Sequence, residues 1–139
     1  MKSILVDINV VLDVLLDRQP HVRASSRAWA AIEGGAARGF LAAHAVTTIH
    51  YLIRRAVGSS KATKAIGALL TVFEIAPMDD RVIKRAMGLA FGDFEDAVSA
   101  SAGQAAGCDY ILTRDPKGFR SSPVPPITPE AVIPLLERD

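Results

Sequence analysis

The sequence predicts an α/β fold, a three-layer α/β/α sandwich around a mostly parallel central sheet. Short apolar runs that are typical of strands buried on both faces alternate along the chain with segments of helical periodicity. Strands separated by helices pair in parallel, because a crossover helix returns the chain to the same end of the sheet. The 139 residues contain no repeat, low-complexity tract or linker, so we expect a single domain over residues 1–139.

Each expected strand is an apolar run that ends at a charged residue, a proline or a helical segment. The expected strands are 3–6, 39–43, 73–76, 110–113 and a minimal strand at Ile127. Helices are expected where apolar residues recur three and four positions apart between residues that start or stop helices. The first four helices are expected after Asp7, from Pro20 to Gly34-Gly35, over 45–57 and over 61–72. The last three are expected after Asp79 or Asp80, over 93–106 and over 129–137. Ser59 or Ser60 is expected to cap the helix at 61–72.

Composition excludes several classes of protein. Half of the residues are apolar and 22% are charged, with 16 Lys and Arg against 15 Asp and Glu, which is unlike a disordered chain. The apolar runs fall far short of the ~20 residues of a membrane span. The single cysteine, Cys108, can form neither an internal disulfide nor a thiolate metal cage. We therefore expect a cytoplasmic protein without a membrane segment.

The charges are distributed unevenly. No carboxylate occurs between Glu33 and Glu74, whereas three acids fall within Asp93–Asp96. The carboxylate-free stretch holds the basic residues Arg38, Arg54, Arg55, Lys61 and Lys64. A basic stretch and an acidic group in one small protein favour a phosphate-bearing partner near a cation site, although solvated helix faces explain the charges equally well.

The acids that follow the predicted strands are candidates for a functional site. Asp7 and Asp115 come just after buried strands, so both are expected in the crevice at the carboxyl ends of the sheet. Asp93 and Asp96 lie three apart at the start of a helix and share one face of it. Taken singly, each of these acids also has a structural explanation as a cap or turn residue.

Convergence of these acids would require a cation or protonation. Two carboxylates about 4 Å apart repel by about 4 kcal/mol at an effective dielectric of ~20. Three converging carboxylates would approach the ~5–15 kcal/mol stability of a whole domain. Oxygen ligands favour Mg²⁺ or Mn²⁺ over zinc. A divalent ion at this edge of the sheet indicates phosphodiester hydrolysis.

Three segments together give the chain a resemblance to the PIN-domain family. They are Val6–Val10, Asp93–Val98 and Ile111–Asp115, the last with Lys117 and Phe119 behind it. The Asp-Phe-Glu-Asp sequence at 93–96 resembles a subgroup of the family. The resemblance implies a metal-dependent ribonuclease for single-stranded RNA, often a VapC-type toxin that forms a homodimer and is silenced by a cognate antitoxin.

The resemblance also assigns roles to residues. It implies metal binding and catalysis by Asp7, Asp96 and Asp115, with Asp93 as an additional acid and Asn9 and Thr113 in support. The residues expected to contact nucleic acid or a partner are Arg54, Arg55, Arg114 and Lys117.

One position departs from the family pattern. Thr48 occupies the place where many active members carry a glutamate, and it is the third expected supporting residue. Either Thr48 or His50 would hold a water-mediated metal contact there, or Asp93 would supply the missing charge from the other helix. A weak or inactive PIN-fold module that binds RNA or an antitoxin is therefore the alternative function. A haloacid-dehalogenase-like phosphatase is disfavoured, because Asn9 stands where that chemistry requires a second aspartate.

Overall fold

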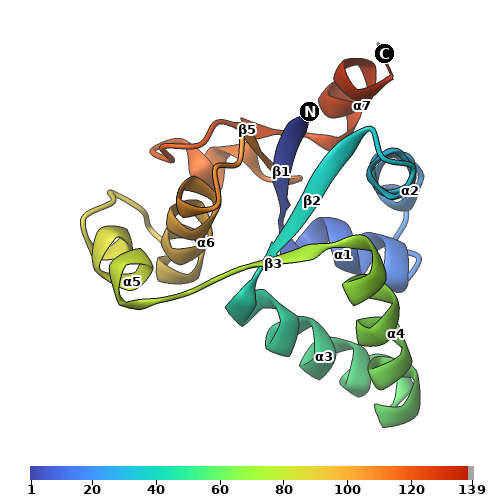
Figure 1. The fold of residues 1–139 in the computed structure, drawn as a ribbon. Coiled ribbons are helices and arrows are strands. Elements are labelled where there is room, and N and C mark those ends of the chain that lie inside the picture. Colours follow the sequence, from blue (N-terminus) through green and yellow to red (C-terminus); the bar gives the residue numbers. More distant parts are fainter. Residues whose placement is uncertain (138–139) are drawn as a thin grey trace.

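The sheet has five strands, all parallel. The computed structural model describes residues 1–137 and orders the strands β3-β2-β1-β4-β5 (Figure 1). Their bounds are β1 Lys2–Val6, β2 Ala37–Ala42, β3 Glu74–Ala76, β4 Tyr110–Leu112 and β5 Pro126–Ile127. The chain adds β2 and β3 on one side of β1 and then β4 and β5 on the other, so the strand order reverses at β1. The predicted parallel α/β sandwich is confirmed.

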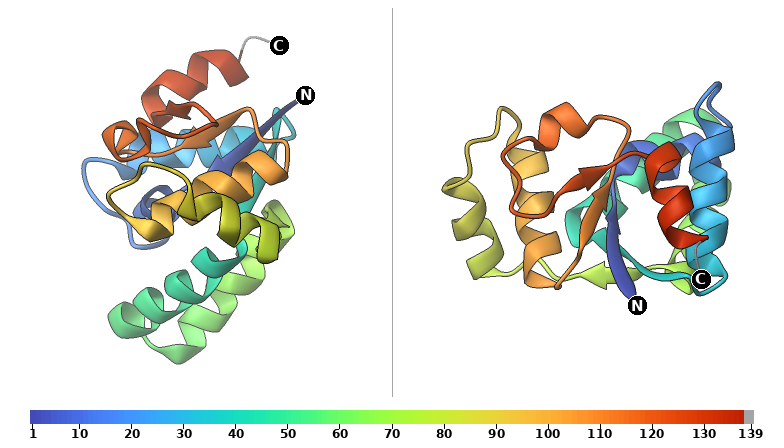
Figure 2. Two further views of the ribbon diagram at one scale, coloured as in Figure 1. Left: turned by 90° about the vertical axis from the view of Figure 1, so that its left-hand side faces the viewer. Right: turned by 90° about the horizontal axis from the view of Figure 1, so that it is seen from above.

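Helices cover both faces of this sheet. The helical elements are α1 Ile8–Leu15, α2 Val22–Glu33, α3 Ala43–Val57, α4 Ser59–Val72, α5 Asp80–Met87, α6 Phe94–Ala105, the 3₁₀-helix η1 Pro116–Phe119 and α7 Pro129–Leu136. Helix α6 packs on one face with α5 outside it, and α1, α2 and α7 lie on the other (Figures 1 and 2). Helices α3 and α4 form an antiparallel pair that extends from the β2–β3 side. Within residues 1–137, no helix has the length and apolar character needed to cross a membrane.

Close packing of α2 on β2 depends on a glycine. A Cβ atom at Gly39 would lie 2.7 Å from Ile32 Cγ2 and 2.7 Å from Phe73 Cδ1. Phe73 in turn packs edge-to-face against Trp29, with ring centroids 5.1 Å apart. The absent side chain at position 39 therefore allows two large residues to meet over the strand.

Most helix starts follow the predicted capping chemistry. Asp79 Oδ1 accepts a hydrogen bond from the Val82 amide at 3.0 Å, and Asp93 Oδ1 accepts one from the Asp96 amide at 3.0 Å. The predicted serine cap of α4 is wrong. Gly58, at φ +97°, occupies the cap position, so that Ser59 starts the helix directly. The left-handed conformation of Gly58 joins α3 to α4 through one residue and leaves no place for an extended serine cap.

Candidate active site

The carboxyl edge of the sheet brings together residues that are far apart in the sequence. Val6 of β1 is paired with Leu112 of β4, and the Asp7 amide donates to the Leu112 carbonyl at 2.9 Å. Asp7 and Thr113 therefore leave neighbouring parallel strands side by side. Beyond these strand ends, η1 lies beside α6 (Figure 2).

A buried threonine connects the acids that follow the two strands. Thr113 Oγ1 donates to Asp7 Oδ2 at 2.8 Å and accepts from the Asp115 amide at 3.0 Å. Asp7 Oδ1 accepts from the Ile8 amide at 2.8 Å and so caps α1. Burial raises the pKa of Asp7, against the lowering effect of these two hydrogen bonds, and repulsion from Asp115 adds to the rise. Thr113 thus fixes the orientation of a carboxylate whose charge is unfavourable.

Asp96 and Asp115 face a common point beside η1. A Cβ atom placed on Gly118 would lie 3.0 Å from Asp115 Oδ2 and 3.5 Å from Asp96 Oδ2. Burial, with the negative charges of Asp7, Asp93, Asp115 and Glu95, raises the pKa of Asp96 to about 6. The amino end of a helix favours negative charge, and Asp96 lies in the first turn of α6. Burial and the neighbouring acids nevertheless raise its pKa.

The acids border a cavity of about 470 Å³ between the α5–α6 connection and η1. Asp93, Asp96 and Asp115 line it together with Lys117, whereas Asp7 lies behind this group through Thr113. Asp93 also caps α6, so one of its oxygens is engaged by the helix. Glu95, which lies between Asp93 and Asp96 in the sequence, is exposed.

The donor set suits a hydrated hard cation. Within residues 1–137, no three His, Cys, Asp or Glu side chains form a complete metal cage. Mg²⁺ is usually bound through one or two carboxylates and retains several waters, so a complete cage is unnecessary. Asp96 and Asp115 meet this requirement, because neither carboxylate accepts a hydrogen bond from another group in the described part of the chain.

A buried ion pair holds the loop that carries Thr113 and Asp115. Asp13 in α1 is fully buried, and its Oδ2 accepts from Arg114 Nε at 2.6 Å and from Ser25 Oγ at 3.2 Å. The Arg114 amide donates to Asn9 Oδ1 at 3.4 Å. Arg114 was predicted to contact nucleic acid, but its guanidinium lies against α1, and Asn9 holds its backbone. Sequence reasoning missed Asp13, although an acid inside the apolar run Val10–Leu16 is unusual enough to be a signal.

The remaining predicted residues lie along α3. Thr48 Oγ1 donates back to the His44 carbonyl at 3.5 Å, and His44 Nε2 lies 3.4 Å from Ser99 Oγ of α6. Arg54 and Arg55 are exposed in the last turn of α3, away from the acids, where Arg55 lies 5.8 Å from the Tyr51 ring centroid.

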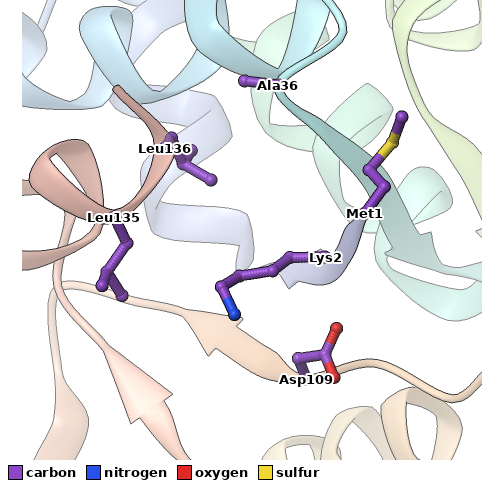
Figure 3. A pocket seen from close by; sticks show the side chains of 6 residues that line it. All are labelled: Met1, Lys2, Ala36, Asp109, Leu135 and Leu136. Atoms are coloured by element: carbon purple, nitrogen blue, oxygen red, sulfur yellow. The ribbon is translucent and has the colours of Figure 1, made fainter. Parts of the chain in front are cut away.

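A second cavity lies at the opposite end of the sheet. The side chains of Met1, Lys2, Asp109 and Leu136 line this cavity, which has a volume of about 370 Å³ (Figure 3). This cavity lies at the amino ends of β1 and β4, whereas functional crevices of parallel α/β sheets form at the carboxyl ends. The acidic site is therefore the better candidate.

The fold and the site define an α/β protein with an acidic crevice at the carboxyl edge of a parallel sheet. The family model described as "PIN domain" matches residues 3–117, and the chain belongs to the PIN-domain family. Ribonuclease VapC1 of Aquifex aeolicus (strain VF5) is 25% identical over 134 residues, which are 93% of this chain and 92% of that protein. The membership of the subgroup with the Asp-Phe-Glu-Asp sequence stays a prediction.

Solved structures share the fold. The structure of VapBC2 from Rickettsia felis bound to a promoter DNA fragment matches with a TM-score of 0.69 and 12% identity, covering 91% of this chain and 98% of that one. The sarcin-ricin loop cleaving toxin VapC20 of Mycobacterium tuberculosis matches with a TM-score of 0.64 and 19% identity, covering 78% of this chain and 87% of that one. At these identities the likeness concerns the fold.

Proposed function

We propose that this protein is a Mg²⁺- or Mn²⁺-dependent endoribonuclease that cleaves single-stranded RNA. The observation that carries the proposal is the convergence of Asp96 and Asp115 beside Gly118, with Asp7 held behind them by Thr113. The similarity to a ribonuclease and to an RNA-cleaving toxin supports the same chemistry.

Each acid has a distinct part in the proposed site. Asp96 and Asp115 would bind the ion, and Asp7 and Asp93 would add negative charge or hold its water ligands. When bound, a divalent ion supplies a water nucleophile at neutral pH and counter-charge for the phosphate. Thr113 keeps Asp7 oriented, and the Asp13–Arg114 pair keeps the β4–η1 loop in place. Lys117 lines the same cavity and would contact an RNA phosphate next to the reacting one.

We also propose that the protein is the toxin of a type II toxin–antitoxin pair, with a cognate antitoxin as partner and a homodimer as its assembly. Complexes of similar toxins with their antitoxins support this partner. The exposed α3–α4 pair offers a surface, because Tyr51 and Leu70 are 50% and 52% exposed and Arg54 and Arg55 are exposed in the last turn of α3.

Cleavage of single-stranded RNA tests the enzymatic proposal. The wild type is expected to cut in Mg²⁺ or Mn²⁺ and to stop when the ion is chelated. Asp96→Asn should reduce cleavage by at least about a hundredfold, as expected for loss of an electrostatic catalytic group. Glu95→Gln removes an equal charge from the adjacent exposed position and should retain activity. Equal loss in both variants, or cleavage that survives chelation, would contradict the proposal.

A binding module is the second candidate, and one observation favours it. Thr48 stands where the family pattern has a glutamate in many active members. Such a module would bind RNA with an affinity that falls as salt rises, without metal-dependent cleavage. The cleavage assay above, read together with RNA affinity, separates the two functions.

A further inference from the structure

Two cations share the cavity with the carboxylates. Lys117 lies in η1 and Arg120 directly follows it, and both line the cavity that Asp96 and Asp115 border. The Arg120 amide donates to the Lys117 carbonyl at 3.3 Å. Residues three apart in a 3₁₀-helix eclipse one another, so these two side chains leave the same side of η1. The 3₁₀-turn therefore presents a pair of positive charges.

These cations do not neutralise the neighbouring acids. In the described part of the chain, the four ion pairs involve neither Lys117 nor Arg120. Both side chains are exposed. A cavity with unpaired charge of both signs on its wall matches a ligand that carries a cation at one end and an anion at the other. A metal-bound phosphodiester with a further phosphate has this charge pattern.

The cavity is also large enough for more than a phosphate. Its volume of about 470 Å³ lies within the ~300–1,000 Å³ of small-molecule sites. Phe91 lines it and is half-buried, because it packs edge-to-face on buried Phe119 with ring centroids 5.9 Å apart. Proteins that bind single-stranded nucleic acid commonly combine an aromatic side chain, which contacts a base or sugar, with basic side chains, which contact the phosphate. Phe91 and the pair Lys117 and Arg120 are such a combination.

We propose that this cavity binds the nucleotide adjacent to the scissile phosphodiester, with the non-scissile phosphate of that nucleotide on Lys117 and Arg120. The inference rests on the proposed ribonuclease function and adds to it a subsite that sets how the RNA strand lies across the acids. The strand runs from the carboxylates over Gly118 toward Arg120, with Phe91 contacting a base or sugar.

The test combines protein and substrate substitutions. The cleavage position of the wild type is mapped on a single-stranded RNA. Oligonucleotides are then made with one neutral methylphosphonate at the neighbouring phosphate on either side. Lys117→Gln and Arg120→Gln are each compared with Arg23→Gln, an exposed cation of α2 on the other face of the sheet. Cleavage gives kcat and KM, and fluorescence anisotropy gives Kd.

Each cavity variant should raise KM and Kd about two- to fivefold and leave kcat within about twofold, as for an exposed ion pair. A methylphosphonate on one side of the cleavage position should weaken RNA binding to the wild type by a similar factor. It should have little further effect on Lys117→Gln and Arg120→Gln, which already lack one of the cations. The control Arg23→Gln should behave as the wild type. Equal effects of the methylphosphonate in all proteins would overturn the subsite. If the wild type does not cleave, methylphosphonates are placed at each linkage in turn and the comparison is read from Kd alone. The ribonuclease proposal would then fail. The nucleotide site would still be supported if the methylphosphonate weakened binding to the wild type but had little further effect in the two cavity variants.

Discussion

Replacing Asp96 by asparagine is expected to stabilise the metal-free protein and to remove its response to divalent ions. The folded protein raises the pKa of Asp96 from 3.8 to about 6, because the carboxyl is partly buried among four other acids. The folded state therefore binds this proton more tightly than the unfolded chain. The stability of the wild type should fall as pH rises from about 4 to about 6, and the loss should be complete above the folded pKa.

The difference between these pKa values sets an upper limit of about 3 kcal/mol on the penalty. Asp96 is only partly buried, and solvent screening reduces the expected gain of the variant at pH 7.5 to about 1 kcal/mol. The Asp96 carboxylate accepts no hydrogen bond from the described residues. The hydrogen bond from the Asp96 backbone amide to Asp93 Oδ1 is unaffected by the substitution. The gain in stability is therefore not offset by the loss of a hydrogen bond.

Urea unfolding at pH 7.5, in chelator and in Mn²⁺, measures this prediction. In chelator, Asp96→Asn should be about 1 kcal/mol more stable than the wild type, and the difference should vanish near pH 4. Mn²⁺ at about a hundred times its Kd should stabilise the wild type by about 2.7 kcal/mol and the variant much less. Glu95→Gln should follow the wild type. A destabilised variant in chelator, or equal stabilisation of both proteins by Mn²⁺, would refute the reasoning.

Four further substitutions test the surroundings of the site and the packing of the helices. Gly118→Ala places a methyl group against the carboxylates of Asp96 and Asp115. Mn²⁺ affinity measured by calorimetry should therefore fall about tenfold, while the unfolding midpoint changes little. An unchanged affinity would contradict a shared metal position of the two carboxylates beside η1. Arg114→Leu leaves the fully buried Asp13 without its cation, which should lower the free energy of unfolding by about 3–5 kcal/mol, and a loss below about 1 kcal/mol would show that the pair is not needed. Gly39→Ala overpacks the contact of α2 with β2 and should destabilise by about 1–3 kcal/mol in urea, whereas Gly67→Ala, at an open position in α4, should stabilise by about 0.5–1 kcal/mol.

The features that local pattern determines could be predicted from the sequence. Buried strands such as Ile4–Val6 are continuous apolar runs, and acids at strand ends must lie at one edge of a parallel sheet. The position of Asp7 beside Thr113 depends on the pairing of β1 with β4, whereas the alternation of elements predicts only that the strands are parallel. Asp79 and Asp93 are caps because an acid before a helix has an amide to accept from.

The features that depend on distant partners could not be predicted. Arg114 reads in sequence as a loop cation, and only the fold brings it to Asp13, 101 positions away. The cap of α4 depends on the left-handed conformation of Gly58, which the tight connection of two helices selects. The approach of Gly118 to Asp96 and Asp115 joins η1 to α6, and no local pattern predicts that contact.

If Thr48 stands in place of a glutamate, as the family resemblance implies, we expect it to affect the site through charge rather than through shape. Thr48 bonds back to its own helix, so it offers its hydroxyl to the His44 carbonyl and not to the acids. Asp93 supplies charge from the other side, but one of its oxygens caps α6, so it acts on Asp96 by repulsion more than as a full ligand. With fewer carboxylates to repel one another, the metal-free site is less strained and the ion is held less tightly. With less negative charge in the site, Lys117 and Arg120 should attract the RNA phosphates more strongly. Substrate and ion should therefore bind together more strongly than either binds alone.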